Sequence, residues 1–144
     1  MTVGVIGPAG FDRFADNIAD ALRCMGHRVV QLGPAHLSYG NRHVSNVATL
    51  ARQAMPSLDE RAQRRIVRSA LDAGCEVVIN VDLRLAPDAV ARLRRAGTRV
   101  AFWFPDAVSQ LGRQLMVLAP YDAVFFKEPY LVDRFRANLD MPVY

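Results

Sequence analysis

The sequence is poor in the features that define several common classes of protein. Its two cysteines, Cys24 and Cys75, lie too far apart in the chain for a compact metal-binding motif or a disulfide scaffold. No apolar run approaches the roughly 20 residues that span a membrane. Met1 leads directly into a strand-like segment, without the basic and apolar regions of a secretory signal peptide. We therefore expect a protein of the reducing cytoplasm.

Signatures of nucleotide binding and catalysis are also missing. Gly4, Gly7 and Gly10 form GxxGxxG rather than GxGxxG, and no acidic residue ends the second predicted strand, so a nicotinamide-dependent dehydrogenase is not expected. A P-loop, an HExxH zinc motif and the GxSxG motif of serine hydrolases are all absent from the sequence. We therefore expect neither a cofactor nor a metal ion.

The composition is that of an ordinary globular domain. Of the 144 residues, 51% are hydrophobic and 22% are charged, with a formal net charge of +4. Four arginines, Arg61, Arg64, Arg65 and Arg68, fall on one face of a predicted helix. No aromatic residues are interleaved with them, as a nucleic-acid groove would require. The pattern predicts a solvated helix face, and we expect no nucleic-acid partner.

Short apolar runs alternate with segments of helical spacing along the chain. The predicted strands are 3–6, 28–32, 76–81, 98–104, 121–126 and 141–144. The predicted helices are 12–25, 44–54, 57–73, 87–96, 108–118 and 129–137. Because the strands are apolar on both faces, the pattern predicts an α/β fold: a Rossmann-like, doubly wound parallel sheet with helices on both faces.

The chain forms one predicted domain, residues 1–144, and its C-terminal end raises a question. The last residues, 142–144, lie inside an apolar run with no helix or polar tail after them. They could form a genuine edge strand. Because a domain rarely leaves its last strand uncovered, we favour the alternative that the chain is the N-terminal half of a longer two-domain protein.

Polar residues and glycines follow several of the predicted strands. Ligands of open α/β sheets bind beyond the carboxyl ends of the strands, so residues at these positions are candidates for a site. Taken alone, an aspartate after a strand is also typical of a helix cap or a turn. The candidates are Gly7, Pro8, Gly10, Asp12, Asp82, Arg84, Pro105, Asp106, Lys127 and Glu128.

One segment resembles response-regulator receiver domains. Residues 81–88, VDLRLAPD, are similar to the segment around their phosphorylated aspartate, and Lys127 is similar to the lysine after their fifth strand. However, Gly7 and Pro8 stand where receivers hold magnesium with acidic residues, and Pro105 follows the fourth strand where a hydroxyl residue is expected. This resemblance implies, as the alternative function, a degenerate receiver-like or other non-catalytic binding module.

A second resemblance covers nearly the whole chain. The segment 6–8 with the helix that follows, the segment 101–106 (AFWFPD) and the segment 120–128 (PYDAVFFKE) resemble the N-terminal part of CgeB-like, spore-maturation-type glycosyltransferases of the GT-B class. The resemblance implies two Rossmann-like domains that face each other across a cleft. The second domain, absent from this chain, would bind the nucleotide-sugar donor, and this chain would hold the sugar acceptor.

The glycosyltransferase resemblance also implies roles for residues. Asp106, or else Asp12 or Asp82, would be the catalytic base that deprotonates the acceptor. The substrate would be bound by Gly7, Pro8, Gly10, Phe11, Arg13, Lys127 and Glu128. We expect Trp103 to be a core residue rather than a platform for a sugar ring. The fragment alone would be inactive, and its missing partner domain would leave an apolar face through which it could form a homodimer.

Overall fold

The computed structural model describes residues 1–8, 10, 13–35, 57–104, 119–138 and 140–144. The helices expected at 44–54 and 108–118 lie outside these residues. The strands are β1 (Thr2–Ile6), β2 (Arg28–Gly33), β3 (Val77–Asn80), β4 (Arg99–Phe104) and β5 (Ala123–Phe126). The helices are α1 (Phe14–Cys24), α3 (Ser57–Asp72), α4 (Pro87–Arg95) and α6 (Pro129–Arg136).

The five strands form one parallel sheet in the order β2-β1-β3-β4-β5. The chain therefore leaves β1 in one direction to form β2 and returns to the other side of β1 to form β3. The last residues pair with β5: Val143 forms a parallel bridge to Val124, and the Tyr144 N–H donates to the Val124 carbonyl at 2.8 Å. The predicted α/β fold with a parallel sheet is confirmed.

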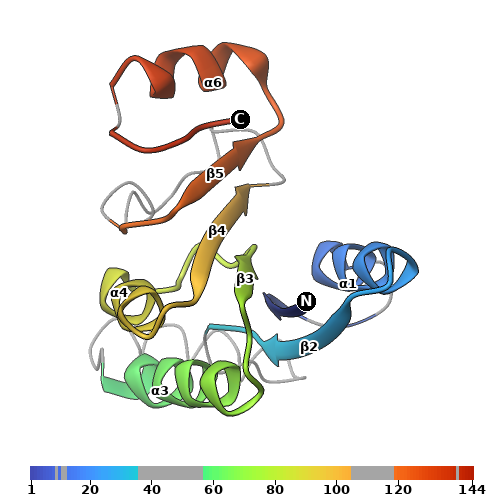
Figure 1. Cartoon of the computed structure of the whole chain (residues 1–144). Coiled ribbons are helices and arrows are strands. Elements are labelled where there is room, and N and C mark those ends of the chain that lie inside the picture. Colours follow the sequence, from blue (N-terminus) through green and yellow to red (C-terminus); the bar gives the residue numbers. More distant parts are fainter. Residues whose placement is uncertain (9, 11–12, 36–56, 105–118, 139) are drawn as a thin grey trace, which may run out of the picture.

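Helices cover the two faces of the sheet unequally (Figure 1). On one face, residues of α3 and α4 pack with the β-strands in the main hydrophobic core, and Phe135 of α6 stacks on Phe126 at 4.8 Å between ring centroids. On the other face, α1 contributes Ala15, Ile18 and Ala19 to a smaller core over β1. The sheet is thus a middle layer between helices, as the apolar strands predict.

Local sequence signals explain where several helices begin and end. Pro87 and Pro129 occupy the first turns of α4 and α6, where a missing backbone N–H costs nothing. Gly26 and Gly97 follow α1 and α4 with φ values of +82° and +88°, a conformation that favours glycine. The four arginines of α3 are exposed, which confirms the prediction of a solvated helix face.

The two cysteines differ in their surroundings. We expect both to be small core residues, and this is correct for Cys75, which is 5% exposed, and wrong for Cys24, which is exposed near the end of α1. Burial raises the pKa of the Cys75 thiol, an effect that the nearby Arg28 partly opposes. Cys75 is therefore shielded from reagents both sterically and as a protonated thiol.

We predict that a thiol reagent modifies one cysteine in the native protein and two in the denatured protein. Cys24 reacts within the mixing time of a colorimetric assay near neutral pH, whereas Cys75 reacts only after unfolding in urea. A Cys24→Ser variant provides the control, because its native form should show no fast reaction. Rapid modification of that variant under native conditions would contradict the burial of Cys75.

Candidate functional site

The carboxyl ends of the strands place several predicted residues at one edge of the sheet. Gly7 follows β1 directly, Asp82 lies two residues beyond β3, and Lys127 follows β5. In a sheet of this order, the switch point between β1 and β3 is where ligands bind. Gly7 and Asp82 therefore flank the candidate site, and the residues around them decide what it can hold.

Gly7 brings the backbone after β1 close to its neighbours. A Cβ atom at this position would lie 2.5 Å from Val81 Cγ2 and 2.9 Å from the Ala15 Cβ, both closer than carbon atoms can approach. The Gly7 N–H also donates to the Gly33 carbonyl at 3.1 Å, which joins the ends of β1 and β2. Gly7 is therefore required by the packing of Val81 and Ala15 beneath α1.

A carboxylate that sequence reasoning missed holds Gly10, four residues before α1. Asp16, in the first turn of α1, accepts a hydrogen bond from the Gly10 N–H at 2.6 Å and another from the Gln31 side chain. Gly10 has φ +145°, and its carbonyl accepts the Arg13 N–H at 3.2 Å. An acidic residue in a helix's first turn is the signal that could have identified this role. Gly10 is thus held through both its N–H and its carbonyl, and Arg13 is exposed.

Asp82 is buried and is bonded to the backbone of two loops. It is 7% exposed, and its Oδ2 accepts the Ala35 N–H at 2.8 Å while its Oδ1 accepts the Arg84 N–H at 3.0 Å. These bonds join the loop after β2 to the loop after β3, on the two sides of β1. A carboxylate engaged in this way supports the geometry of the edge. It does not resemble the exposed phosphoacceptor of a receiver domain.

A buried polar network lies beneath Asp82. Asn80 is 0% exposed, and its Nδ2 donates to the Tyr121 hydroxyl at 2.9 Å and to the Asp82 carbonyl at 3.0 Å. Its Oδ1 accepts the Asp82 N–H at 3.0 Å. Burial raises the pKa of the Tyr121 phenol far above its usual value, although the bond from Asn80 opposes this and the Asp82 charge adds to it. The sequence pattern of an apolar strand concealed this network.

The structure does not bring Lys127 and Glu128 to the switch point. They follow β5, which is separated from β1 by β3 and β4. Three strand spacings of about 4.8 Å place the ends of β1 and β5 roughly 14 Å apart. Lys127 is exposed, and the Glu128 carbonyl accepts the first backbone bonds of α6. Their predicted role in substrate binding stays a prediction.

Other predicted residues of the site have varied outcomes. Pro8 lies beside Gly7 at the edge and is half-buried. Phe11, Asp12 and Asp106 lie outside the described residues, so the roles predicted for them stay predictions.

Within the described ranges, no group of three or more histidine, cysteine, aspartate or glutamate side chains could hold a metal ion. Among the same residues, no helix is long and apolar enough to cross a membrane.

The expectation that Trp103 is a core residue is wrong. It is 38% exposed on the α1 side of the sheet, where its ring meets Phe14 edge-on at 5.4 Å and lies 5.8 Å from Phe125. Phe125 stacks in turn on Tyr144 at 5.3 Å. The reason is that β4 is apolar on both faces, but α1 covers β1 and β2 rather than β4. The Trp103 side chain therefore contacts the first residue of α1 and remains accessible to solvent.

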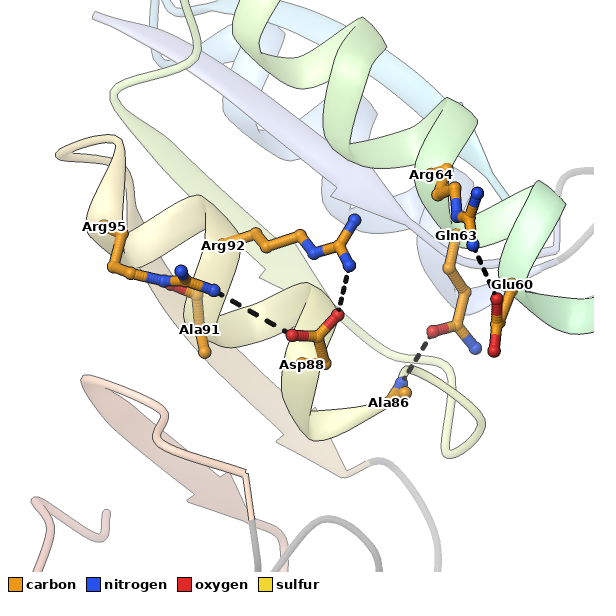
Figure 2. A network of polar contacts seen from close by, with 8 residues as sticks. All are labelled: Glu60, Gln63, Arg64, Ala86, Asp88, Ala91, Arg92 and Arg95. Atoms are coloured by element: carbon orange, nitrogen blue, oxygen red, sulfur yellow. Dashed lines mark hydrogen bonds and ion pairs between the residues drawn. The ribbon is translucent and has the colours of Figure 1, made fainter. Parts of the chain in front are cut away.

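A hollow of about 360 Å³ between α3 and α4 is less suited to a ligand than the carboxyl edge of the sheet. Figure 2 shows the polar contacts of the residues around it. Its arginines are paired along their own helices: Arg64 with Glu60 at 2.7 Å and Arg92 with Asp88 at 2.8 Å. Gln63 donates to the Arg84 carbonyl at 3.0 Å and accepts the Ala86 N–H at 3.2 Å. These contacts hold α3 against the loop after β3, which is a structural role.

Comparison with known proteins identifies a fold but no family. No protein-family model matches the chain, and no curated protein sequence does. The chain is similar to two solved structures of the LacI family transcriptional regulator CCPA from Weissella paramesenteroides, one with bound sucrose and one with bound glucose. The TM-scores are 0.53 and 0.52 and the sequence identities are 14% and 13%, respectively. Each match covers 96% of this chain and 40% of the regulator.

These structures correct the resemblance to glycosyltransferases. The two matched structures are of a LacI family transcriptional regulator with bound sucrose or glucose and not of a glycosyltransferase, so a glycosyltransferase function and a nucleotide-sugar donor are not supported. The residues behind the resemblance have structural explanations. Phe102 and Phe104 are core residues. The Tyr121 hydroxyl accepts a hydrogen bond from the Asn80 side chain, and the Asp122 carboxylate accepts the Val100 N–H at 2.8 Å. Short motifs of this kind arise from packing and need not indicate a reaction.

Proposed function

We propose that this domain is a binding module for a small, hydroxyl-rich ligand of the sugar class, held at the switch point between β1 and β3. The observation that carries the proposal is the exposed backbone of Gly10, whose N–H donates to Asp16 and whose carbonyl accepts the Arg13 N–H. Gly10 is exposed and carries no side chain, so a ligand can approach the backbone closely there. The similarity to regulators that hold sucrose and glucose supports the ligand class.

The surroundings of the loop suit a neutral polar ligand. Asp16 holds Gly10, and Asp82 holds the loops on both sides of β1, so the edge is organised before a ligand arrives. Such preorganisation lowers the entropic cost of binding. Arg13, exposed beside the loop, supplies several hydrogen-bond donors for hydroxyl oxygens. Nothing in this arrangement requires a chemical step.

The fluorescence of Trp103, the single tryptophan of the chain, provides a direct test. Its ring contacts Phe14 at the head of α1, next to the loop, so a ligand at the edge should change its emission. We expect a saturable change on titration with glucose or sucrose at micromolar to millimolar concentrations, and no saturable change with glycerol. Calorimetry should return the same dissociation constant.

Two glycine variants separate ligand binding from stability. Gly10→Ala places a side chain at φ +145° within the loop, and Gly97→Ala does the same at φ +88° at the opposite edge of the sheet. Each strained residue costs stability on the order of 1 kcal/mol. We expect only Gly10→Ala to weaken sugar binding, by about fivefold or more. Equal sugar affinities in the two variants, or no saturable binding to the unmodified chain, would contradict the proposal.

A further inference from the structure

Part of the sheet has an apolar face that the described helices leave uncovered. On the side of α1, a hollow of about 540 Å³ extends over β3, β4 and β5. Figure 1 shows α1 lying over the β2 side of the sheet, away from this region. The hollow is lined by Val77, Ile79, Arg99, Val100, Ala101, Trp103, Asp122, Ala123 and Phe125. Exposed apolar surface of this kind is typical of an interaction site.

The residues that line the hollow change in character along β4 and β5. Ala101 and Ala123 are direct neighbours in the register and form its centre. Trp103 and Phe125, also neighbours in the register, form its end at the carboxyl edge. At the opposite end, Arg99 begins β4, while Asp122 precedes β5. The face thus runs from a charged end, through two small residues, to an aromatic end.

We infer that this face binds a second copy of the same chain, with a two-fold axis parallel to the strands between β4 and β5. Such an axis sets β4 of one copy against β5 of the other, with the charged ends at the same end of the interface. Ala101 then faces the partner's Ala123, and Trp103 faces the partner's Phe125. Because the interface is isologous, each contact occurs twice.

Charge complementarity favours a second copy over an unrelated apolar segment. The same axis brings Arg99 to the partner's Asp122, and none of the ion pairs between described residues involves Arg99. Asp122 accepts bonds from Arg94 at 2.8 Å and from the Val100 N–H at 2.8 Å. Its oxygens have the capacity to accept further donors. A partner without a matching carboxylate would leave the guanidinium group of Arg99 unpaired at the interface.

The oligomeric state in solution tests this inference. Sedimentation equilibrium of the unmodified chain should show a concentration-dependent transition from 16.0 kDa to twice that mass. Arg99→Glu places four carboxylates together across the interface and should raise the dimer dissociation constant about tenfold or more. Ala101→Glu, at the centre of the hollow, should abolish the dimer. Arg68→Glu makes the same charge reversal on the exposed surface of α3 and should leave the dissociation constant unchanged.

Several results would overturn the inference. One is an unmodified chain that stays at the monomer mass at all accessible concentrations. Another is a dimer whose dissociation constant is the same in the Arg99→Glu, Ala101→Glu and Arg68→Glu variants. Circular dichroism of each variant shows whether the fold is retained. If Ala101→Glu proves unfolded, the comparison of Arg99→Glu with Arg68→Glu decides the matter alone.

Discussion

The Asp82→Ala variant should lose about 3 kcal/mol of its free energy of unfolding, with no change in the denaturant m-value. Asp82 is buried and accepts the N–H groups of Ala35 and Arg84. Its removal leaves those two donors without the acceptor, and an unsatisfied buried donor costs about 1–3 kcal/mol. Urea unfolding followed by circular dichroism measures the loss. Because the five strands belong to one sheet, a two-state analysis is suitable.

The Asp82→Asn variant sharpens this prediction. Its carbonyl oxygen can keep one of the two bonds, whereas its NH₂ group faces the other N–H, so we expect about half of the loss seen with alanine. A carboxylate that acts as a catalytic base or phosphoacceptor at the surface would behave differently. Its replacement would change stability by no more than about 0.5 kcal/mol. A small change in both variants would therefore contradict the structural role that we assign to Asp82.

Phe102→Ala and Trp103→Ala, adjacent in the sequence, should differ greatly in stability. Phe102 is fully buried in the main core, with its ring 5.4 Å from that of Tyr121 and 6.2 Å from that of Phe104. Truncation of a buried phenylalanine costs about 3–5 kcal/mol, because it leaves a cavity. Trp103 lies on the open part of the other face, so its truncation should cost less than about 1.5 kcal/mol.

The comparison is made by urea unfolding at protein concentrations low enough to keep the chain monomeric. Association would otherwise add to the apparent stability of the unmodified chain. If Trp103→Ala is as destabilising as Phe102→Ala, then the face that carries Trp103 is covered and both the fold description and the inferred dimer are wrong.

The secondary structure was predictable because its signals are local. Short apolar runs that end at Gly7 or Gly33 predict the first two strands, and Pro87 marks the first turn of α4. Helices on both faces follow from strands that are apolar on both faces. These features depend only on neighbouring residues, which is why they can be recognised in a single sequence.

The arrangement of the candidate site was less predictable because it depends on contacts between distant residues. The bond from Asn80 to Tyr121 joins residues 41 positions apart, and Asp82 reaches Ala35 across 47 positions. The separation of Lys127 from the switch point follows only from the order of the strands. An apolar strand also does not reveal which of its faces a helix covers, so the exposure of Trp103 could not be predicted.

The central claim is that a sugar binds at the carboxyl edge between β1 and β3, and amide chemical shifts locate binding directly. The measurement is a series of two-dimensional ¹⁵N–¹H spectra recorded during titration with glucose. The account predicts saturable shifts of the amides of Gly7, Gly10, Arg13 and Arg84, with those of Gly26, Gly74 and Gly97 at the opposite edge unchanged. Spectra without saturable shifts, or with shifts confined to the opposite edge, would contradict it.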